Sequence, residues 1–180
     1  MKNLNTKTYF LSNLRPSPEN ISDYIKHVDF LENTLLKLEQ KNEKAKLFSE
    51  IGFKKAILEN YLDAINYLEK AIKIFEELNL EKNLIVAKIR LATTFQWAKN
   101  FEKANKLFDL ILEEINKNTN LIDYKDFAYQ HRGKNFFDQF FYEKALDDFE
   151  KALEIRNLKN DSELISSTIL AINTTKAFIN

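Results

Sequence analysis

Three segments of this 180-residue sequence repeat the same chemistry at the same spacing. Each segment begins with a small residue and has an alanine twelve positions later; the pairs are Gly52 and Ala64, Ala92 and Ala104, and Gly133 and Ala145. An aromatic residue precedes each alanine by three positions, and a large apolar residue follows it by four; these residues are Tyr61 and Leu68, Phe101 and Phe108, and Tyr142 and Phe149. A spacing that recurs three times predicts a stack of similar units, because each unit buries its apolar face against the next.

The small residues predict close crossings between antiparallel helices. Helices approach closely only where their facing side chains are small, so Gly52 in a first helix is expected to face Ala64 in the next. The two glycines of the sequence, Gly52 and Gly133, occupy the same position in their units. Because glycine inside a helix costs about 1 kcal/mol relative to alanine, a packing role explains both.

Composition favours an all-α chain. The sequence has two glycines and two prolines, which is few of the turn residues that strands and tight hairpins require. Hydrophobic residues make up 44% of the sequence, which is enough for one continuous core. The sequence therefore predicts a right-handed stack of antiparallel helix pairs with a leading and a trailing capping helix. We expect eight helices, with or without a further short turn in residues 8–14.

The repeated pattern resembles the tetratricopeptide repeat, a helix–turn–helix unit with a small residue, an aromatic, alanine, a large apolar residue and a second alanine at these intervals. The resemblance covers about Ala45 to Arg156. The units recur 40 and 41 residues apart rather than about 34. No unit ends in the usual proline, Lys88 stands where a large apolar residue is expected, and Arg132 stands where leucine is usual. The third unit and its tail also look like a group of small stand-alone bacterial repeat proteins, a resemblance that implies no reaction.

The expected organisation is one continuous domain. It comprises an N-terminal segment with a capping helix (1–44), three repeat units (45–80, 81–120 and 121–158) and a C-terminal capping helix (159–180). Ser17 is the expected N-cap of the leading helix, with Pro18 at its first helical position. Asp161 or Ser162 is the expected cap of the last helix.

Charge and residue usage argue against several functional classes. The 27 cationic and 27 anionic side chains cancel, so the field needed to hold nucleic acid is missing. The sequence has no cysteine and two histidines, His27 and His131, which argues against disulfides, metal sites and cofactors. No segment approaches the roughly 18 consecutive apolar residues of a spanning helix, and the N-terminus lacks the hydrophobic run of a secretory signal. We therefore expect a cytoplasmic protein without membrane contact.

The family resemblance implies that the first helices of the pairs line a concave surface on which partners bind. The candidate partner-binding residues there are Phe53, Arg90, Thr93, Trp97, Gln130, His131, Lys134 and Asp138, with Ser49, Ile57, Gln96 and Phe137 beside them. His131, Lys134 and Asp138 are spaced at i, i+3 and i+7, which places them on one helix face. Trp97 near Arg90 has the composition of an interface hot spot. Trp97 and Phe137 are either exposed on this face or packed between the repeats, and the sequence leaves both alternatives open.

The leading hypothesis is a non-enzymatic module that binds a protein or peptide with apolar anchors and acidic side chains. Members of the family that grip a terminal carboxylate use lysine and asparagine on successive first helices, and the matching positions here lack that set: Ser49, Phe53, Arg90, Phe127 and His131.

Three other functions are weighed against this hypothesis. An enzyme is disfavoured because His131, Lys134 and Asp138 form a row rather than converging on one reacting atom. A glycine-rich phosphate loop is also absent from the sequence. The main alternative is a structural protein that assembles into a homodimer through its end helices. A more distant alternative is a peptide sensor without an effector domain.

Overall fold

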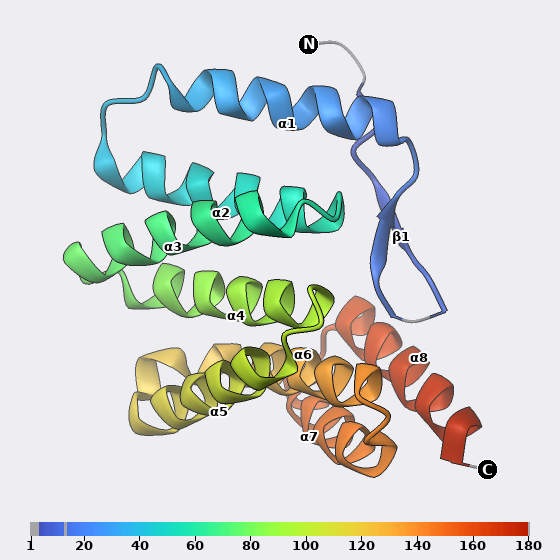
Figure 1. Cartoon of the computed structure of the whole chain (residues 1–180). Coiled ribbons are helices and arrows are strands. Elements are labelled where there is room, and N and C mark those ends of the chain that lie inside the picture. The colour runs from blue at the N-terminus through green and yellow to red at the C-terminus, as the bar shows by residue number, and fades with distance from the viewer. Residues whose placement is uncertain (1–3, 13, 180) are drawn as a thin grey trace.

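The computed structural model describes residues 4–12 and 14–179, and eight α-helices follow one another through them as a stack (Figure 1). A leading helix, α1 (Ile21–Leu35), comes before three antiparallel pairs, and α8 (Ser162–Ile179) follows them. The pairs are α2 (Lys41–Ile57) with α3 (Tyr61–Glu77), α4 (Glu81–Trp97) with α5 (Phe101–Lys117), and α6 (Lys125–Asp138) with α7 (Tyr142–Lys159). A 3-10 helix, η1 (Thr119–Tyr124), leads into α6. This order confirms the predicted all-α stack of one leading helix, three pairs and one trailing helix.

Each pair is joined by the same kind of turn, although none of the turns contains glycine. The turn residue adopts a left-handed conformation in all three, with φ of 63°, 62° and 64° at Glu59, Lys99 and Phe140. In the first turn the Asn60 N–H donates to the Lys55 carbonyl oxygen at 3.0 Å, and the other two turns repeat this bond. This hydrogen bond is the Schellman arrangement that satisfies the last carbonyls of a helix. The repeated aromatic residue then begins the second helix, as Tyr61, Phe101 and Tyr142.

The glycines lie at the predicted close crossings. A Cβ atom on Gly52 would lie 2.8 Å from Cγ of Leu68 and 3.0 Å from the Ala64 carbonyl oxygen. A Cβ atom on Gly133 would lie 2.6 Å from Cε1 of Phe149. Contacts this short are far inside van der Waals distance, so the packing of each pair depends on the missing side chain.

The two polar departures from the repeat pattern form ion pairs between neighbouring helices. Lys88 on α4 lies 2.8 Å from the Glu114 carboxylate on α5. Arg132 on α6 reaches Asp148 on α7 at 2.7 Å and Asp109 on α5 at 2.8 Å. These ion pairs stand where the repeat pattern predicts apolar contacts. The ion pair between Arg132 and Asp109 also links the second helix pair to the third.

The structure corrects the prediction for the residues before α1. Two short antiparallel strands, β1 (Thr8–Phe10) and β2 (Pro16–Pro18), form a hairpin where we expected at most a short turn. The predicted helix start was wrong: Ser17 and Pro18 lie in β2, and the side chain of Asn20 caps α1 by accepting the Asp23 N–H at 3.0 Å. The prediction of a helix start at Pro18 was wrong because proline is compatible with an edge strand as well as with a first helical turn.

The end of the stack follows the prediction. Asp161 accepts the Leu164 N–H at 3.1 Å, and Ser162 begins α8. At the other end α1 packs on α2, so each terminal helix covers a neighbouring pair. The predicted unit boundary at residue 45 falls inside α2, which begins at Lys41.

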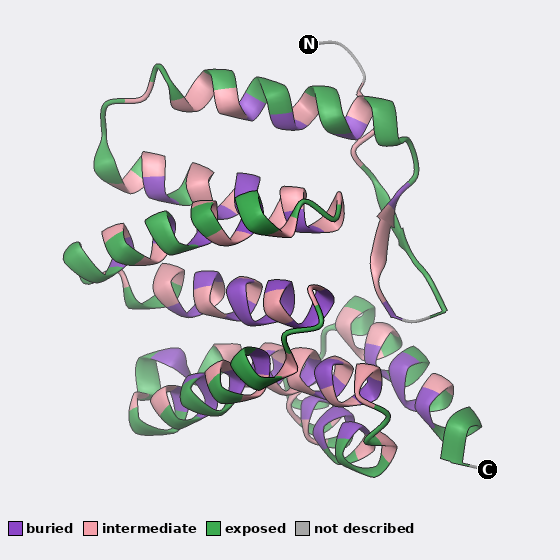
Figure 2. Ribbon diagram, viewed as in Figure 1, coloured by how far each residue is buried: buried purple, intermediate pink, exposed green. Residues whose placement is uncertain are grey.

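The stack is curved, and α2, α4 and α6 form its inner layer. α2 contacts α4 and α4 contacts α6, whereas no contact of similar extent joins α3 to α5 or α5 to α7 within the described residues. Because the first helices lie closer together than the second helices, the concave side is the side of the first helices. The hairpin runs along the stack from α1 toward α8 (Figure 1). Buried residues concentrate on the central helix α4, and much of α1 is exposed (Figure 2). None of the helices in the described part of the chain is long and apolar enough to cross a membrane.

Candidate binding site on the concave side

Two of the cavities on the concave side adjoin each other. The first cavity has a volume of about 350 Å³ and is lined by Phe53, Val86, Ile89, Arg90, Tyr124, Phe127 and His131. The second, which we call the hairpin cavity, has a volume of about 280 Å³ and lies between the inner helices, the hairpin and α8. Phe53, Phe127 and His131 line both cavities, so the two spaces share a wall. Both are close in size to ordinary small-ligand sites.

All eight predicted site residues lie on the inner helices, but they do not all face open space. Thr93, Trp97 and Gln130 are buried, with exposed fractions of 1%, 7% and 3%. The expectation that Thr93 and Gln130 lie on a free face was wrong, because both side chains are buried. Thr93, Trp97 and Gln130 instead form part of the wall of the hairpin cavity.

Both Trp97 and Phe137 pack between structural elements, which resolves the alternative that the sequence left open. Trp97 clusters with Ala56 and Ala64, and its ring lies 5.6 Å from that of Phe53. Phe137 is 7% exposed and clusters with Leu14 from the turn of the hairpin. A hydrophobic side chain at a repeat position is more often buried than exposed, and both aromatics follow that rule.

Asp138 holds the hairpin against the stack. Its carboxylate accepts from Nη2 of Arg15 at 2.6 Å and from Nε2 of Gln96 at 3.1 Å. The Asp138 carboxylate is therefore engaged within the chain, and its contact with a partner stays a prediction. Phe53, Arg90, His131 and Lys134 remain half-buried in the cavity walls, where a ligand has access to them.

Three cations in the cavity walls lie over phenyl rings. The guanidinium of Arg90 lies 5.4 Å from the ring centre of Phe53, and the ammonium of Lys134 lies 4.6 Å from that of Phe10. Sequence reasoning did not single out the third cation, Arg156 on α7, whose guanidinium lies 5.4 Å from the ring of Phe127. The negative faces of aromatic rings stabilise cations removed from water.

Arg156 is almost fully buried and joins three helices. Its Nε donates to Asp126 on α6 at 2.9 Å, and its Nη1 donates to Gln130 at 3.1 Å and to Thr168 on α8 at 2.6 Å. Lys159 shares the Asp126 carboxylate, at 2.6 Å. The repeat pattern gave no signal for this residue, because the matching positions of the other two units are apolar, Phe75 and Ile115.

The cations lower the pKa values of their neighbours. Burial, reinforced by Lys134, Arg156 and Arg90, lowers the pKa of His131 to about 3, so its imidazole is neutral at physiological pH. Burial and Arg156 lower the pKa of Lys134 to about 8, although Asp138 opposes the shift. Nδ1 of His131 lies 3.1 Å from the Thr93 hydroxyl. The cavity walls therefore combine a neutral imidazole with the cations Arg90, Lys134 and Arg156, which favours groups that bring hydrogen-bond acceptors or negative charge.

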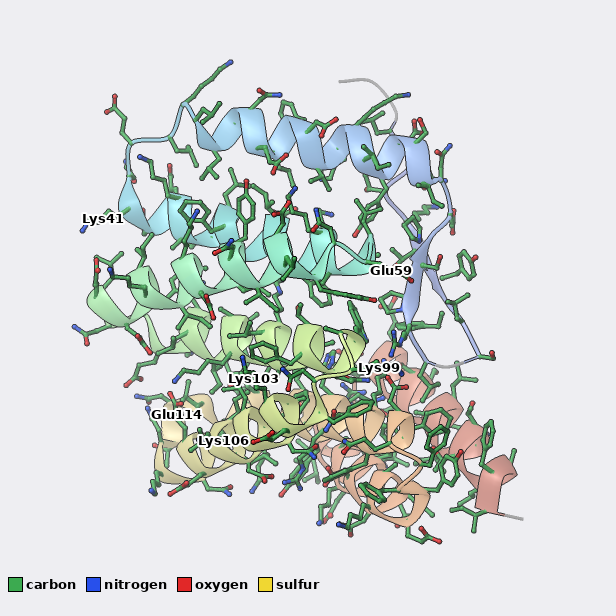
Figure 3. The ribbon with its side chains drawn as sticks, viewed as in Figure 1. Lys41, Glu59, Lys99, Lys103, Lys106 and Glu114 are labelled. Atoms are coloured by element: carbon green, nitrogen blue, oxygen red, sulfur yellow. The ribbon has the colours of Figure 1, made fainter. Side chains whose placement is uncertain are left out.

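Charge is not confined to the concave side. Figure 3 shows charged side chains along the outer helix α5, where Lys103, Lys106 and Glu114 are labelled. The ammonium of Lys103 also lies over a ring, 5.3 Å from the centre of Phe95, so the cavity cations differ from it in their burial. Among the described residues, no group of three or more His, Cys, Asp and Glu side chains is arranged to hold a metal ion.

Comparison with known proteins supports the fold. No family model and no curated protein matches the sequence. Among solved structures, the chain is similar to the crystal structure of BtubC (BKLC) from P. vanneervenii, with 20% sequence identity and a TM-score of 0.66. The match covers 87% of this chain and 66% of that one, slightly less than two thirds of the neighbour's length. The likeness identifies a helical-repeat-like all-α fold.

Proposed function

We propose that this protein is a cytoplasmic, non-enzymatic binding module of the bacterial tetratricopeptide type, which holds a peptide segment of a partner protein on its concave side. The observation that carries the proposal is the first cavity, whose walls are mostly apolar and include Arg90 and His131. A groove between helices takes the apolar side chains of a bound segment as anchors. The threefold repeat pattern and the similarity to a solved helical-repeat-like structure support the same proposal.

Arg90 gives the cavity its preference for acidic segments. Its Nη1 donates to the Ser49 hydroxyl at 2.9 Å, and no carboxylate of the described residues forms an ion pair with it. Burial lowers the pKa of its guanidinium, and Glu50 partly offsets this effect. A carboxylate from a partner would accept a charge-assisted hydrogen bond from this half-buried guanidinium. We therefore propose a ligand with an aromatic or aliphatic anchor beside a carboxylate.

Peptide display tests this proposal and does not require the partner to be identified first. A random peptide library selected on the immobilised protein should yield sequences that combine an apolar anchor with an acidic residue. Arg90→Met keeps the aliphatic stem and removes the charge, and it should weaken the selected peptides at least tenfold in fluorescence anisotropy. Lys106→Met on the outer helix α5 is the matched control and should leave affinity unchanged. A selection without enrichment, or equal losses in both variants, would contradict the proposal.

A homodimer is the second candidate, and the exposed side of α8 favours it. Leu170 and Phe178 are 51% and 57% exposed there. Apolar residues gathered at the end of a stack are typical of an interface that repeats the packing of the stack. Light scattering over a concentration series separates the candidates, because a monomer at every concentration excludes the dimer.

A further inference from the structure

The hairpin cavity combines an apolar wall with a cluster of hydrogen-bond donors. Phe10 and Pro16 of the hairpin, Ile57, Trp97 and Phe127 provide apolar surface. Gln130, His131 and Lys134 line the same cavity from one face of α6, and Arg156 reaches it from α7. Arg156 and Gln130 are in direct contact at 3.1 Å, so the polar groups lie together rather than scattered around the wall.

Two of these polar groups have donors without acceptors. Gln130 is 3% exposed; its Oε1 accepts from Arg156, but its buried Nε2 has no partner among the described residues. The ammonium of Lys134 forms no hydrogen bond or ion pair with any residue in the described part of the chain, and its contact is the ring of Phe10 at 4.6 Å. Buried donors in proteins are almost always paired, so the Gln130 Nε2 atom indicates a missing acceptor, and the half-buried ammonium of Lys134 lines the same cavity.

The neighbouring carboxylates are already engaged. Asp126 pairs with Arg156 and Lys159, at 2.9 Å and 2.6 Å, and Asp138 accepts from Arg15 and Gln96. Lys134 is therefore left without a direct carboxylate contact among the described residues, beside an apolar space. One such ammonium matches a single negative charge, and the apolar wall matches a hydrocarbon body.

We propose that the hairpin cavity binds a small organic acid, with its carboxylate between the side chains of Lys134 and Gln130 and its apolar body against Phe10 and Trp97. The volume of about 280 Å³ limits the ligand to a short aliphatic chain or a single ring system. This site does not rest on the proposed peptide function, because its carboxylate partners are Lys134 and Gln130 rather than Arg90. Because Phe10 belongs to β1, the hairpin forms one wall of the site.

Octanoate is a suitable probe, and Trp97 provides the signal because it is the only tryptophan of the sequence and lines the cavity. Octanoate should change Trp97 fluorescence saturably and give one site per chain in calorimetry. 1-Octanol, with the same chain and no charge, should bind at least tenfold more weakly. Octylammonium, with the opposite charge, should give no binding.

Substitution of Lys134 tests the carboxylate contact. Lys134→Met keeps the stem of the side chain and should weaken octanoate at least tenfold while leaving the weak binding of 1-octanol unchanged. Lys144→Met, at an exposed position of α7, is the control and should bind octanoate like the unsubstituted protein. Equal affinities for octanoate and 1-octanol, or an unchanged octanoate affinity in Lys134→Met, would overturn the proposal.

A measurement on the unsubstituted protein keeps the test decisive if Lys134→Met does not fold. Nuclear Overhauser effects from octanoate methylene protons should appear on the rings of Trp97 and Phe10. Contacts to the exposed apolar side of α8 instead would indicate nonspecific adsorption and would exclude the site. Arg90→Met should lose peptide binding and keep octanoate binding, because the peptide site and the octanoate site use different cations.

Discussion

At the scale of single residues, the fold depends on positions where a side chain is small or absent. Gly52 and Gly133 each leave space that the facing helix fills, with Leu68 in the first pair and Phe149 in the third. The spacing of small residues was therefore sufficient to predict which helices cross and where. It gave no information on Arg156, because the matching positions of the other units are the apolar residues Phe75 and Ile115.

Gly133→Ala should destabilise the protein even though alanine favours helix. The new Cβ would lie 2.6 Å from Cε1 of Phe149, a ring that is fully buried. We expect overpacking to lower the free energy of unfolding by roughly 1–3 kcal/mol, more than the gain of about 1 kcal/mol in helix propensity. Urea denaturation measures the difference. Ala145→Leu should show a loss of the same order, and Lys144→Ala should be nearly neutral; similar losses at all three positions would refute the packing register.

His131 should make the protein less stable in mild acid. Its folded pKa is about 3, mainly because of burial, whereas an unfolded histidine titrates near 6.5. Below pH 6.5 the unfolded chain binds a proton that the folded chain excludes, so stability falls as the pH drops from 6.5 toward 3. At pH 5.5 the loss from this residue is about 1 kcal/mol relative to neutral pH.

Chemical denaturation at pH 7.5 and pH 5.5 tests this account of His131. His131→Gln should lose less stability than the unsubstituted protein between the two values, because glutamine does not titrate. His27→Gln is the comparison variant: burial and Lys54 also lower the pKa of His27, although Glu50 opposes the shift, so this substitution should reduce the pH dependence less than His131→Gln does. An identical pH dependence in His131→Gln would show that the imidazole is not held neutral.

At the scale of secondary-structure elements, the helix pairs were predictable and their turns were not. The aromatic residues Tyr61, Phe101 and Tyr142 marked the starts of the second helices to the residue. The left-handed turn residues gave no signal, because Glu59, Lys99 and Phe140 are not residues that favour this conformation. The Schellman hydrogen bonds and the helix packing hold them in place, so tertiary structure overrides local preference.

The third turn lacks a capping side chain that the first two have. Asn60 and Asn100 accept N–H donors from Asp63 and Lys103, at 3.4 Å and 3.3 Å, whereas Phe141 stands at the matching position of α7 and offers no acceptor. Phe141→Asn should raise the free energy of unfolding by about 0.5–1 kcal/mol, since Phe141 is 48% exposed and contributes little to the core. Asn100→Ala should cause a loss of similar size. Thermal and urea denaturation measure both variants, and a destabilised Phe141→Asn would mean that the ring contributes more to packing than its exposure indicates.

The N-terminal hairpin was the element that the sequence predicted worst. Its strands are three residues each, and its hold on the stack comes from Leu14 and Arg15, which meet residues of α6 more than 100 positions away in the chain. Periodicity within a short window cannot report such contacts. Ser17 followed by Pro18 instead suggested a helix start. The hairpin that forms there lines the same cavity as several of the predicted binding residues.

At the scale of the whole molecule, the direction of curvature places the recognition surface. The first helices contact one another across neighbouring pairs, and the two cavities lie on their side. The repeat register was enough to assign the candidate residues to those helices. Their exposure was not predictable, because it depends on the hairpin and α8, which lie outside the repeated units.

The most direct test of a concave recognition surface is a map of backbone amide shifts by nuclear magnetic resonance during titration with a display-selected peptide. The largest changes should fall on α2, α4 and α6, around Phe53, Arg90 and His131. The outer helices α3, α5 and α7 should change little. Changes concentrated on the outer helices, with the walls of the first cavity unaffected, would contradict this prediction.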